Sequence, residues 1–390
     1  MSSRARALFR VMALVVGALA GLTAQSAARA DEAESLAAIM TRLRVQEAPQ
    51  PVKKHAHWHS PRKVVLLAFG DGTSGPGWAG RETAFAAAAP KAKIVVAKDM
   101  AAALRDTANA DVIVGFNPEI CSAKIIDHAR QLRWIASLYA GVEKCMAVPS
   151  VRHRNLLVTN MRGVDSPVIA EHTMALALAL AHGLDVFAVD TSKGAWNVEH
   201  RTTTPVQTLE GKTMLIVGLG GIGTEVAYRA NALGMKVVAT RDNSRDKPDF
   251  VSYVGLPDEM LTLAKTADVI VNAVPLTPQT TGMYDAKFFA VLKPTAYFIN
   301  VARGGSVVTA DLTAALNEHR LAGAGLDVAD PEPLPADNPL WRAPHVLITP
   351  HISSRSDLPS EARWILAAEN LRRYANGEKM LLVVDLAKGY

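Results

Sequence analysis

The sequence has little cysteine and little net charge. Its 390 residues include two cysteines, Cys121 and Cys145, and neither lies in a Cys-x-x-Cys motif. A disulfide framework of the kind that stabilises small secreted domains is therefore not expected. The formal net charge is +5, but the first thirty residues contain four arginines and no acidic residue. The rest of the chain is close to neutral, so bulk charge gives no argument for a nucleic-acid partner.

The N-terminal apolar run is too short for a comfortable membrane span. It covers 11–24, which is 14 residues, whereas a spanning helix needs about 20. Arginines precede the run, and Ala28-Arg29-Ala30 provides a small-residue cleavage site before Asp31. Residues 1–30 are therefore predicted to be a cleaved signal peptide, with an uncleaved anchor as the alternative. We expect an exported, periplasmic protein without stable membrane insertion, or a cytoplasmic one if the leader does not function.

Residues 31–62 are predicted to form a short helix followed by a linker rich in proline, lysine and histidine. His55, His57 and His59 alternate in this linker and could bind a metal ion. No cluster of carboxylates lies nearby to complete such a site, so the pattern favours a solvated basic linker and no metal site is predicted.

From Lys63 the sequence alternates between short apolar runs and helix-compatible segments. Runs without polar interruption are typical of parallel strands that are buried on both faces. We expect strands at 63–69, 93–97, 111–116, 133–137 and 156–160, with helices such as 101–109 and 122–130 between them. This pattern predicts a doubly wound, flavodoxin-like α/β domain.

A glycine motif opens a second domain. Four apolar residues from Met214 lead into Gly218-x-Gly220-x-x-Gly223, and a helical pattern and a strand at 236–240 follow. Gly218 permits the tight turn, Gly220 lets the backbone approach a pyrophosphate, and Gly223 allows the helix to pack closely on the strand. Because the motif lies between a strand and a helix, it predicts a Rossmann dinucleotide-binding domain and not merely a flexible turn.

The other expected elements complete two parallel-sheet domains. An apolar helix at 167–182 precedes the glycine motif, and an amphipathic helix at 359–375 ends the chain. Further strands are expected at 268–275, 296–302, 322–328 and 345–350. We assign 167–352 to the dinucleotide-binding domain, and 63–166 together with 353–390 to a discontinuous substrate domain.

Three polar residues follow strands of the second domain, where an open α/β sheet places its ligand crevice. Arg303 precedes two glycines that leave it able to form a bidentate pair with a carboxylate. Glu332 lies in a proline-rich segment, and His351 follows the last strand. Each residue alone is more often structural. Together they offer a guanidinium that can bind an anion through two hydrogen bonds, a proton donor, and a carboxylate that can adjust the pKa of that donor.

The motifs resemble those of the D-isomer-specific 2-hydroxyacid dehydrogenase family, most closely its glyoxylate/hydroxypyruvate reductase-like members. The resemblance covers 63–390. Besides the glycine motif, it rests on SLYAGV at 137–142, IAEH at 169–172, VPLTP at 274–278, NVARG at 300–304, the segment 327–335 and TPH at 349–351.

The resemblance implies catalytic roles. Arg303 would hold the carboxylate and polarise the keto oxygen of a 2-oxo acid. His351 would be the general acid for reduction. Glu332 would form a hydrogen bond to the imidazole ring and so raise the pKa of His351. The backbone around Ala140 and Gly141 would also bind the substrate. Tyr139 stands in that loop, where small residues are common.

The resemblance also implies a cofactor site. Asp327 matches the residue that orients the nicotinamide carboxamide. NAD-preferring members carry an aspartate where this chain has Arg241, so NADP is the expected cofactor, with Arg245 as a second phosphate contact and NAD as the alternative. The other matching cofactor positions are Gly218, Gly220, Gly221, Ile222, Gly223, Val274, Pro275, Thr280, Val301 and Ala302.

We therefore expect an NADP-dependent oxidoreductase that acts on a small 2-oxo acid such as glyoxylate or hydroxypyruvate, and a homodimer as in the family. The alternative is an exported, non-catalytic cofactor-binding or scaffold protein that kept the dehydrogenase fold. The leader favours that alternative, since a periplasmic space is not expected to hold a nicotinamide pool. The presence of Arg303, Glu332 and His351 together favours the enzyme.

Overall fold

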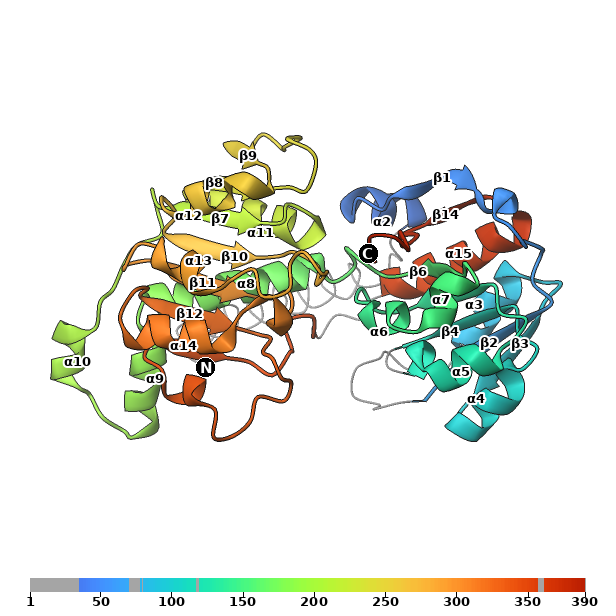
Figure 1. The fold of residues 1–390 in the computed structure, drawn as a ribbon, viewed down its shortest axis with the longest axis horizontal. Helices are drawn as coiled ribbons and strands as arrows, with labels where there is room; N and C mark the ends of the chain where they lie inside the picture. The colour runs from blue at the N-terminus through green and yellow to red at the C-terminus, as the bar shows by residue number, and fades with distance from the viewer. Residues whose placement is uncertain (1–34, 70–77, 79, 117–118, 357–360, 390) are drawn as a thin grey trace, which may run out of the picture. The chain divides into compact units, whose positions relative to one another are not determined.

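The structure is a computed structural model that describes residues 35–69, 78, 80–116, 119–356 and 361–389. The predicted signal peptide lies outside these residues. The chain divides into two compact units, Met1–Arg42 and Leu43–Tyr390. In the first unit the structure describes helix α2 (Leu36–Arg42). The second unit contains two parallel sheets and one short antiparallel sheet (Figure 1).

The first parallel sheet has five strands in the order β3-β2-β4-β5-β6, which is the flavodoxin order. Its strands are β2 (Lys63–Leu67), β3 (Lys93–Ala97), β4 (Val112–Gly115), β5 (Trp134–Ser137) and β6 (Leu157–Thr159). Apolar side chains are buried on both faces, which explains the uninterrupted runs in the sequence. The helices after these strands are α3 (Arg81–Ala88), α4 (Met100–Thr107), α5 (Ala123–His128), α6 (Glu143–Met146) and α7 (Pro149–His153), and a 3-10 turn, η2 (Glu119–Cys121), follows β4.

The second parallel sheet has seven strands in the order β13-β12-β11-β10-β7-β8-β9, which is the Rossmann order with one strand added. The strands are β7 (Thr213–Val217), β8 (Lys236–Thr240), β9 (Tyr253–Gly255), β10 (Val269–Asn272), β11 (Tyr297–Asn300), β12 (Gly323–Leu326) and β13 (Val346–Ile348). The expected fold class, two doubly wound parallel-sheet domains, is confirmed. The short strand β9 was not predicted.

Helices cover both faces of the seven-stranded sheet. On one face, α8 (Ser166–Ala181) and α11 (Gly221–Ala232) bury their apolar side chains against the strands. On the other face lie α12 (Met260–Ala264), α13 (Ala286–Ala290) and α14 (Thr309–Asn317). No single described helix is long and apolar enough to cross a membrane; α8 and α9 (Leu184–Ser192) meet that criterion only as a pair bent by 78°.

The last helix, α15 (Glu361–Asn376), packs on the five-stranded sheet, where Tyr374 stacks on Trp134 of β5 with ring centroids 5.0 Å apart. After α15, strand β14 (Lys379–Leu381) pairs antiparallel with β1 (Glu47–Pro51). Strand β1 was not expected, because it lies in the proline-rich stretch at 31–62. Its prolines are tolerated because β1 pairs with one neighbour only, as an edge strand does.

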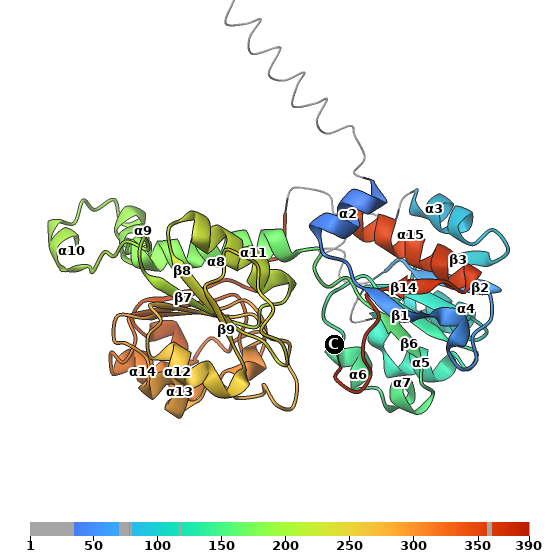
Figure 2. The same cartoon turned by 90° about the horizontal axis from the view of Figure 1, so that it is seen from above.

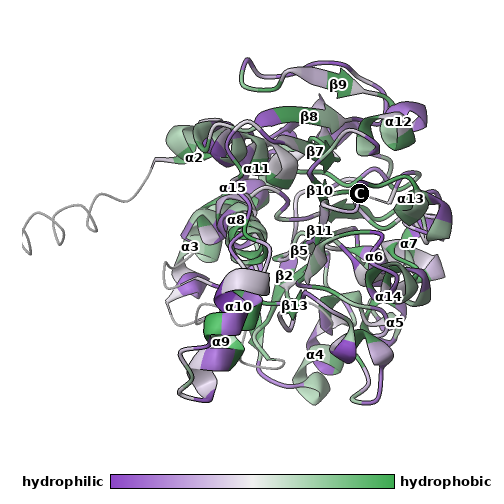
Figure 3. Ribbon diagram, turned by 90° about the vertical axis from the view of Figure 1, so that its left-hand side faces the viewer, coloured by the Kyte–Doolittle hydropathy of each residue, from purple (hydrophilic) through white to green (hydrophobic). Residues whose placement is uncertain are grey.

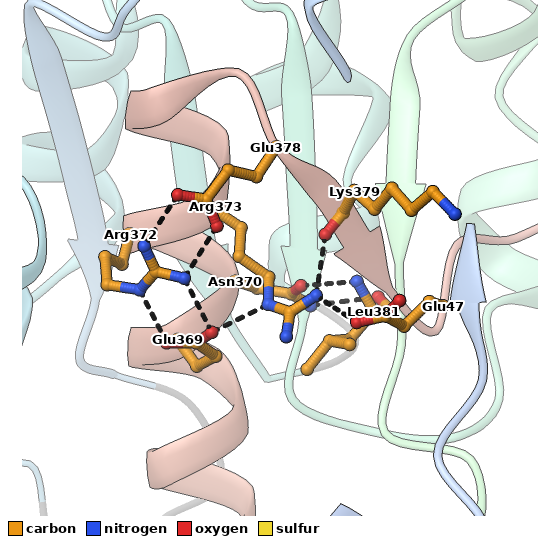
Figure 4. Close-up of polar contacts among 8 residues, drawn as sticks. All are labelled: Glu47, Glu369, Asn370, Arg372, Arg373, Glu378, Lys379 and Leu381. Carbon is orange, nitrogen blue, oxygen red and sulfur yellow. Dashed lines mark hydrogen bonds and ion pairs between the residues drawn. The ribbon is translucent and has the colours of Figure 1, made fainter. Parts of the chain in front are cut away.

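Polar contacts fix α15 to this small sheet (Figure 4). Arg373 donates to Glu47 of β1 at 2.6 Å and to the carbonyl of Lys379 at 3.0 Å. Asn370, which is buried, bonds with both the N–H and the carbonyl of Leu381, at 2.7 and 3.0 Å. The beginning and the end of the second unit are therefore joined by side-chain as well as backbone bonds.

The two cysteines form a disulfide between η2 and α6. The two cysteines in the sequence are too few for a framework of several disulfides, as expected, but they do form one disulfide, which was not expected. Both cysteines belong to the core beneath the five-stranded sheet. Their 24-residue separation gives no sequence signal, because the fold brings the ends of β4 and β5 together and places the two thiols side by side.

Two helices, α9 and α10 (Val198–Thr203), extend from the end of α8 beyond the seven-stranded sheet (Figure 2). Figure 3 shows hydrophobic and hydrophilic stretches alternating along them. Several large apolar side chains in this arm, which we define as residues 184–206, are exposed: Leu184 52%, Val189 48%, Trp196 89%, Val198 55% and Val206 58%.

Candidate active site

The glycine motif forms the turn between β7 and α11. Gly218 has φ +98°, and a Cβ there would lie 2.8 Å from the carbonyl oxygen of Ala273. A Cβ on Gly223 would collide with the carbonyl of Gly218, so this position keeps the helix close to the strand. Beside Gly220, at the N-terminus of α11, there is open space. The turn therefore has the tight bend, the close packing and the room beside the backbone that a pyrophosphate needs.

Arg303 follows β11 and is supported by buried polar groups. Its carbonyl accepts hydrogen bonds from Asn300 Nδ2 at 3.1 Å and Ser306 Oγ at 2.7 Å. Asn272 of β10 links these two side chains, donating to Asn300 at 2.9 Å and to Ser306 at 2.8 Å. Buried and satisfied amide networks of this kind rigidify the backbone. Next to it, Gly304 admits no side chain, because a Cβ would collide with the carbonyl of Ala329.

The guanidinium of Arg303 lies against the predicted substrate loop. Its Nε donates to Glu143 Oε1 at 2.9 Å, and its Nη1 donates to the carbonyl of Ala302 at 2.7 Å. A Cβ on Gly141 would collide with Nη2 of the same guanidinium. The structure thus brings together Arg303 and Gly141, which were predicted separately, and adds Glu143, which was not predicted.

His351 and Glu332 form a hydrogen-bonded pair, with Nδ1 and Oε2 2.9 Å apart. The hydrogen bond to Glu332, with the negative charges of Glu332 and Asp327, raises the pKa of His351 overall, although partial burial and the charge of Arg303 lower it. Burial would raise the pKa of Glu332, but the bonds from His351 and the Ala329 N–H, with the charges of His351 and Arg303, lower it overall. The site therefore contains a carboxylate that stays ionised and a histidine that keeps its proton to higher pH.

Asp327 holds the segment that carries His351. It is 1% exposed, and its Oδ1 accepts from Thr349 Oγ1 at 2.7 Å and the Ile352 N–H at 2.9 Å, while Oδ2 accepts from the Ser353 N–H at 2.9 Å. His351 has φ +53°, a left-handed conformation that costs on the order of 1 kcal/mol. These bonds hold the backbone in that conformation.

His172 of α8 completes this support. Its Nε2 lies 2.9 Å from Thr349 Oγ1 and 3.7 Å from Asp327 Oδ1. The sequence offers the IAEH motif only as part of the family resemblance. The structure gives His172 a contact with the segment of His351, which no sequence spacing could reveal because 177 positions separate His172 from Thr349.

The substrate loop after β5 is fixed by its backbone. Asn160 Nδ2 donates to the carbonyl of Ala140 at 2.8 Å, and the Met161 N–H donates to that of Tyr139 at 3.0 Å. The Tyr139 ring packs edge-on against Phe116, 5.1 Å between centroids. Tyr139 therefore has an aromatic partner, which explains how a large residue is accommodated where the family commonly has small ones.

The two arginines expected near the cofactor ribose have different surroundings. Arg241 follows β8, and its backbone N–H donates to the carbonyl of Gly255 at 3.0 Å. The Nε of its side chain is buried and has no hydrogen-bond partner among the described residues. Arg245, by contrast, donates to Tyr253 Oη at 2.9 Å and to Glu259 Oε2 at 2.7 Å. Arg241 therefore has unused hydrogen-bonding capacity, whereas Arg245 is already engaged.

The remaining predicted cofactor residues lie at the ends of β7, β10 and β11. Val274 and Pro275 follow β10, and Val301 and Ala302 follow β11, with side chains 4% and 6% exposed. Thr280 Oγ1 donates to the carbonyl of Pro275 at 2.7 Å and so shapes this turn. Gly221 and Ile222 belong to the first turn of α11. Among the described residues, no group of three or more histidine, cysteine or acidic side chains could hold a metal ion.

Comparison with protein families gives one match, at residues 174–353, to the model described as "D-isomer specific 2-hydroxyacid dehydrogenase, NAD binding domain". That range contains the glycine turn, Arg303, Glu332 and His351. It contains neither the substrate loop nor Glu143.

Individual relatives cover more of the chain. A glyoxylate reductase of Thermococcus litoralis is 33% identical over 69% of this chain and 81% of its own length. A D-3-phosphoglycerate dehydrogenase of Methanocaldococcus jannaschii is 32% identical over 71% of this chain, but the match spans only 52% of that relative. The solved structure of an NADPH-dependent glyoxylate/hydroxypyruvate reductase of Sinorhizobium meliloti, in complex with NADP and sulfate, is 25% identical, with a TM-score of 0.69 over 84% of this chain and 100% of that one.

Proposed function

The chain belongs to the D-isomer-specific 2-hydroxyacid dehydrogenase family, and from this we propose that it reduces a small 2-oxo acid, glyoxylate or hydroxypyruvate, with NADPH. The observation that carries the proposal is the convergence of Arg303 with Gly141, beside the His351–Glu332 pair. Relatives named as glyoxylate reductases support the substrate class.

The side chains suggest how the reduction proceeds. Arg303 binds the substrate carboxylate and draws electron density from the keto oxygen. His351, whose Nδ1 bonds to Glu332, has its Nε2 left to donate a proton to that oxygen. When bound, the nicotinamide supplies a hydride to the carbonyl carbon. The hydride and the proton convert the 2-oxo acid to a 2-hydroxy acid, and His351 then regains a proton from solvent.

We assign the cofactor preference to Arg241. The open space beside Gly220 and the unpartnered Nε of Arg241 fit a dinucleotide that carries a phosphate on its ribose. An aspartate at this position would accept bonds from ribose hydroxyls and repel the phosphate, whereas arginine does the opposite. Relatives solved with NADPH or NADP support this assignment.

We also propose that the protein is a homodimer that pairs through the arm at 184–206. Trp196 and four other large apolar side chains of the arm are exposed, and burial against a second copy would remove them from water. Sedimentation of the wild type and of Trp196→Ser tests this. The dimer of the variant should dissociate at a higher protein concentration than the wild-type dimer. A monomer at all concentrations for the wild type would refute it.

Export is proposed from the leader, and the Cys121–Cys145 disulfide supports it, because disulfides persist in oxidising compartments. The competing proposal, a non-catalytic cofactor-binding protein, is separated from the enzyme by one assay. Purified mature protein is tested with glyoxylate, hydroxypyruvate and other 2-oxo acids against NADPH and NADH. Turnover of any of them supports the enzyme; tight NADPH binding without turnover would support the scaffold.

A further inference from the structure

The disulfide lies next to the substrate loop. Cys145 belongs to α6, which begins two residues after Gly141, and Cys121 ends η2 just after β4. Both are buried, with Cys145 0% and Cys121 5% exposed. The bridge therefore fixes α6, which follows β5, to η2, which follows the neighbouring strand β4.

Helix α6 depends on such contacts. It has four residues and no side-chain cap at its N-terminus, and an isolated helix shorter than about 12 residues is not stable in water. Cys145 and Met146 are its buried residues. Arg152 adds one hydrogen bond, from Nη1 to the carbonyl of Met146 at 3.1 Å. Of these constraints only the disulfide is covalent.

Glu143, the first residue of α6, holds Arg303. With Nε bonded to Glu143 and Nη1 to the carbonyl of Ala302, two of the three guanidinium nitrogens are fixed, and the plane of the group is set. The third nitrogen, Nη2, lies against Gly141, where an added Cβ would collide with it. Glu143 therefore takes the Nε position, and Nη2 is directed at the loop that is expected to bind the substrate.

We propose that Glu143 is a positioning residue for Arg303, and that the Cys121–Cys145 disulfide fixes the helix that presents it, so that substrate capture depends on the intact bridge. The inference rests on the proposed function, because it assumes that Arg303 receives a substrate carboxylate.

The charge of Glu143 has two opposite effects. Its negative charge near the anion site disfavours a substrate carboxylate, while its hydrogen bond orients the guanidinium. Both side chains are about one-third exposed, at 37% for Glu143 and 32% for Arg303. Solvent therefore screens the repulsion between Glu143 and a substrate carboxylate, whereas the hydrogen bond still orients the guanidinium. Glu143→Gln keeps an oxygen acceptor without the charge, and Glu143→Ala removes both, so the two variants separate these effects.

The test uses the full mature protein and oxamate, an unreactive analogue of a 2-oxo acid, titrated by calorimetry in saturating NADPH, with glyoxylate kinetics alongside. For Glu143→Ala, loss of a charge-assisted bond should raise the oxamate Kd and the glyoxylate KM by about tenfold, with a smaller change in kcat. Glu143→Gln should stay closer to the wild type. Glu378→Ala is the matched control, since Glu378 is also an acidic partner of an arginine and its side chain is 43% exposed.

Combination with Arg303→Ala shows whether Glu143 acts through Arg303. In that background Glu143→Ala should cause no further loss of oxamate affinity, because the group that it orients is gone. If Glu143→Ala instead caused a general structural defect, it would lower the oxamate affinity in the Arg303→Ala background as well. An unchanged oxamate Kd for Glu143→Ala, or an equal loss with and without Arg303, would overturn the inference while leaving the reductase intact. A wild type that neither binds oxamate nor reduces any 2-oxo acid would overturn the proposed function and the inference together.

The bridge is tested in the same titration. Cys121→Ala/Cys145→Ala should raise the oxamate Kd in the same direction as Glu143→Ala and leave NADPH affinity unchanged. If this pair does not fold, dithiothreitol opens the bridge in the native protein: it passes two electrons and two protons to the two sulfurs, the S–S bond breaks, and the reagent closes as a cyclic disulfide. Two thiols counted per chain with an unchanged oxamate Kd would refute the role of the bridge.

Discussion

Arg241→Asp should reverse the choice between NADPH and NADH. The main chain at this position is fixed by the bond from the Arg241 N–H to Gly255, so the substitution changes the side chain without moving the strand end. In the wild type, the buried Nε lacks a partner among the described residues, and a ribose phosphate would supply one. A charge-assisted bond contributes about 1.5–3 kcal/mol, which corresponds to about a ten- to hundredfold preference for NADPH.

The assay is kcat/KM for each cofactor at saturating glyoxylate. Aspartate removes the contact, repels the phosphate and accepts bonds from the ribose hydroxyls, so the NADPH/NADH ratio should fall by at least the wild-type preference and approach or pass unity. Arg245→Ala is the control: its guanidinium already bonds to Tyr253 and Glu259, so the ratio should not change. Equal efficiency with the two cofactors in the wild type would show that Arg241 does not read the phosphate.

Four other predictions concern the active site and the leader. His351→Asn should lower turnover by about two to four orders of magnitude with NADPH binding retained; near-wild-type turnover would refute its role as the acid. Because Glu332 raises the pKa of His351 and reduction needs the protonated ring, kcat/KM should fall as pH rises through that raised pKa, and Glu332→Gln should move the fall to lower pH; an unmoved profile would contradict this. Gly141→Ala should weaken oxamate binding but not NADPH binding, because its Cβ would displace the guanidinium of Arg303; an unchanged oxamate affinity would refute this. Mass spectrometry of protein made in a host with a general secretory pathway should find an N-terminus at Asp31, and an intact leader on all of the protein would count against cleavage.

The elements that the sequence predicts well are those with strong local patterns. The strands at 93–97 and 236–240 are found with the predicted bounds, and the long helix differs from its predicted range by one residue at each end. Their signals, an unbroken apolar run or a run followed by a glycine, lie within a few neighbouring residues. The strand β1 has no such signal, since Glu47, two prolines and a glutamine give no apolar run.

The same distinction applies to the site. Arg303, Glu332 and His351 follow strands, so chain position alone places them at one edge of the sheet. Glu143 belongs to helix α6, which follows a strand of the other sheet, and is recognised only when its carboxylate is seen on Arg303, 160 positions away. The disulfide was missed for the same reason, because its partners meet only through the pairing of β4 with β5.

The pairing of β1 with β14 has a consequence for the order in which the protein can be completed during synthesis. Glu47 is among the first described residues to leave the ribosome, yet its partner Arg373 emerges 326 positions later. The five-stranded sheet also lacks α15 until then, so Trp134 has no Tyr374 to stack on. Domains normally fold as units from the N-terminus onward, but here the first sheet to be translated is the last to receive its cover. The domain built on the five-stranded sheet can therefore complete its packing only after α15 and β14 have been synthesised.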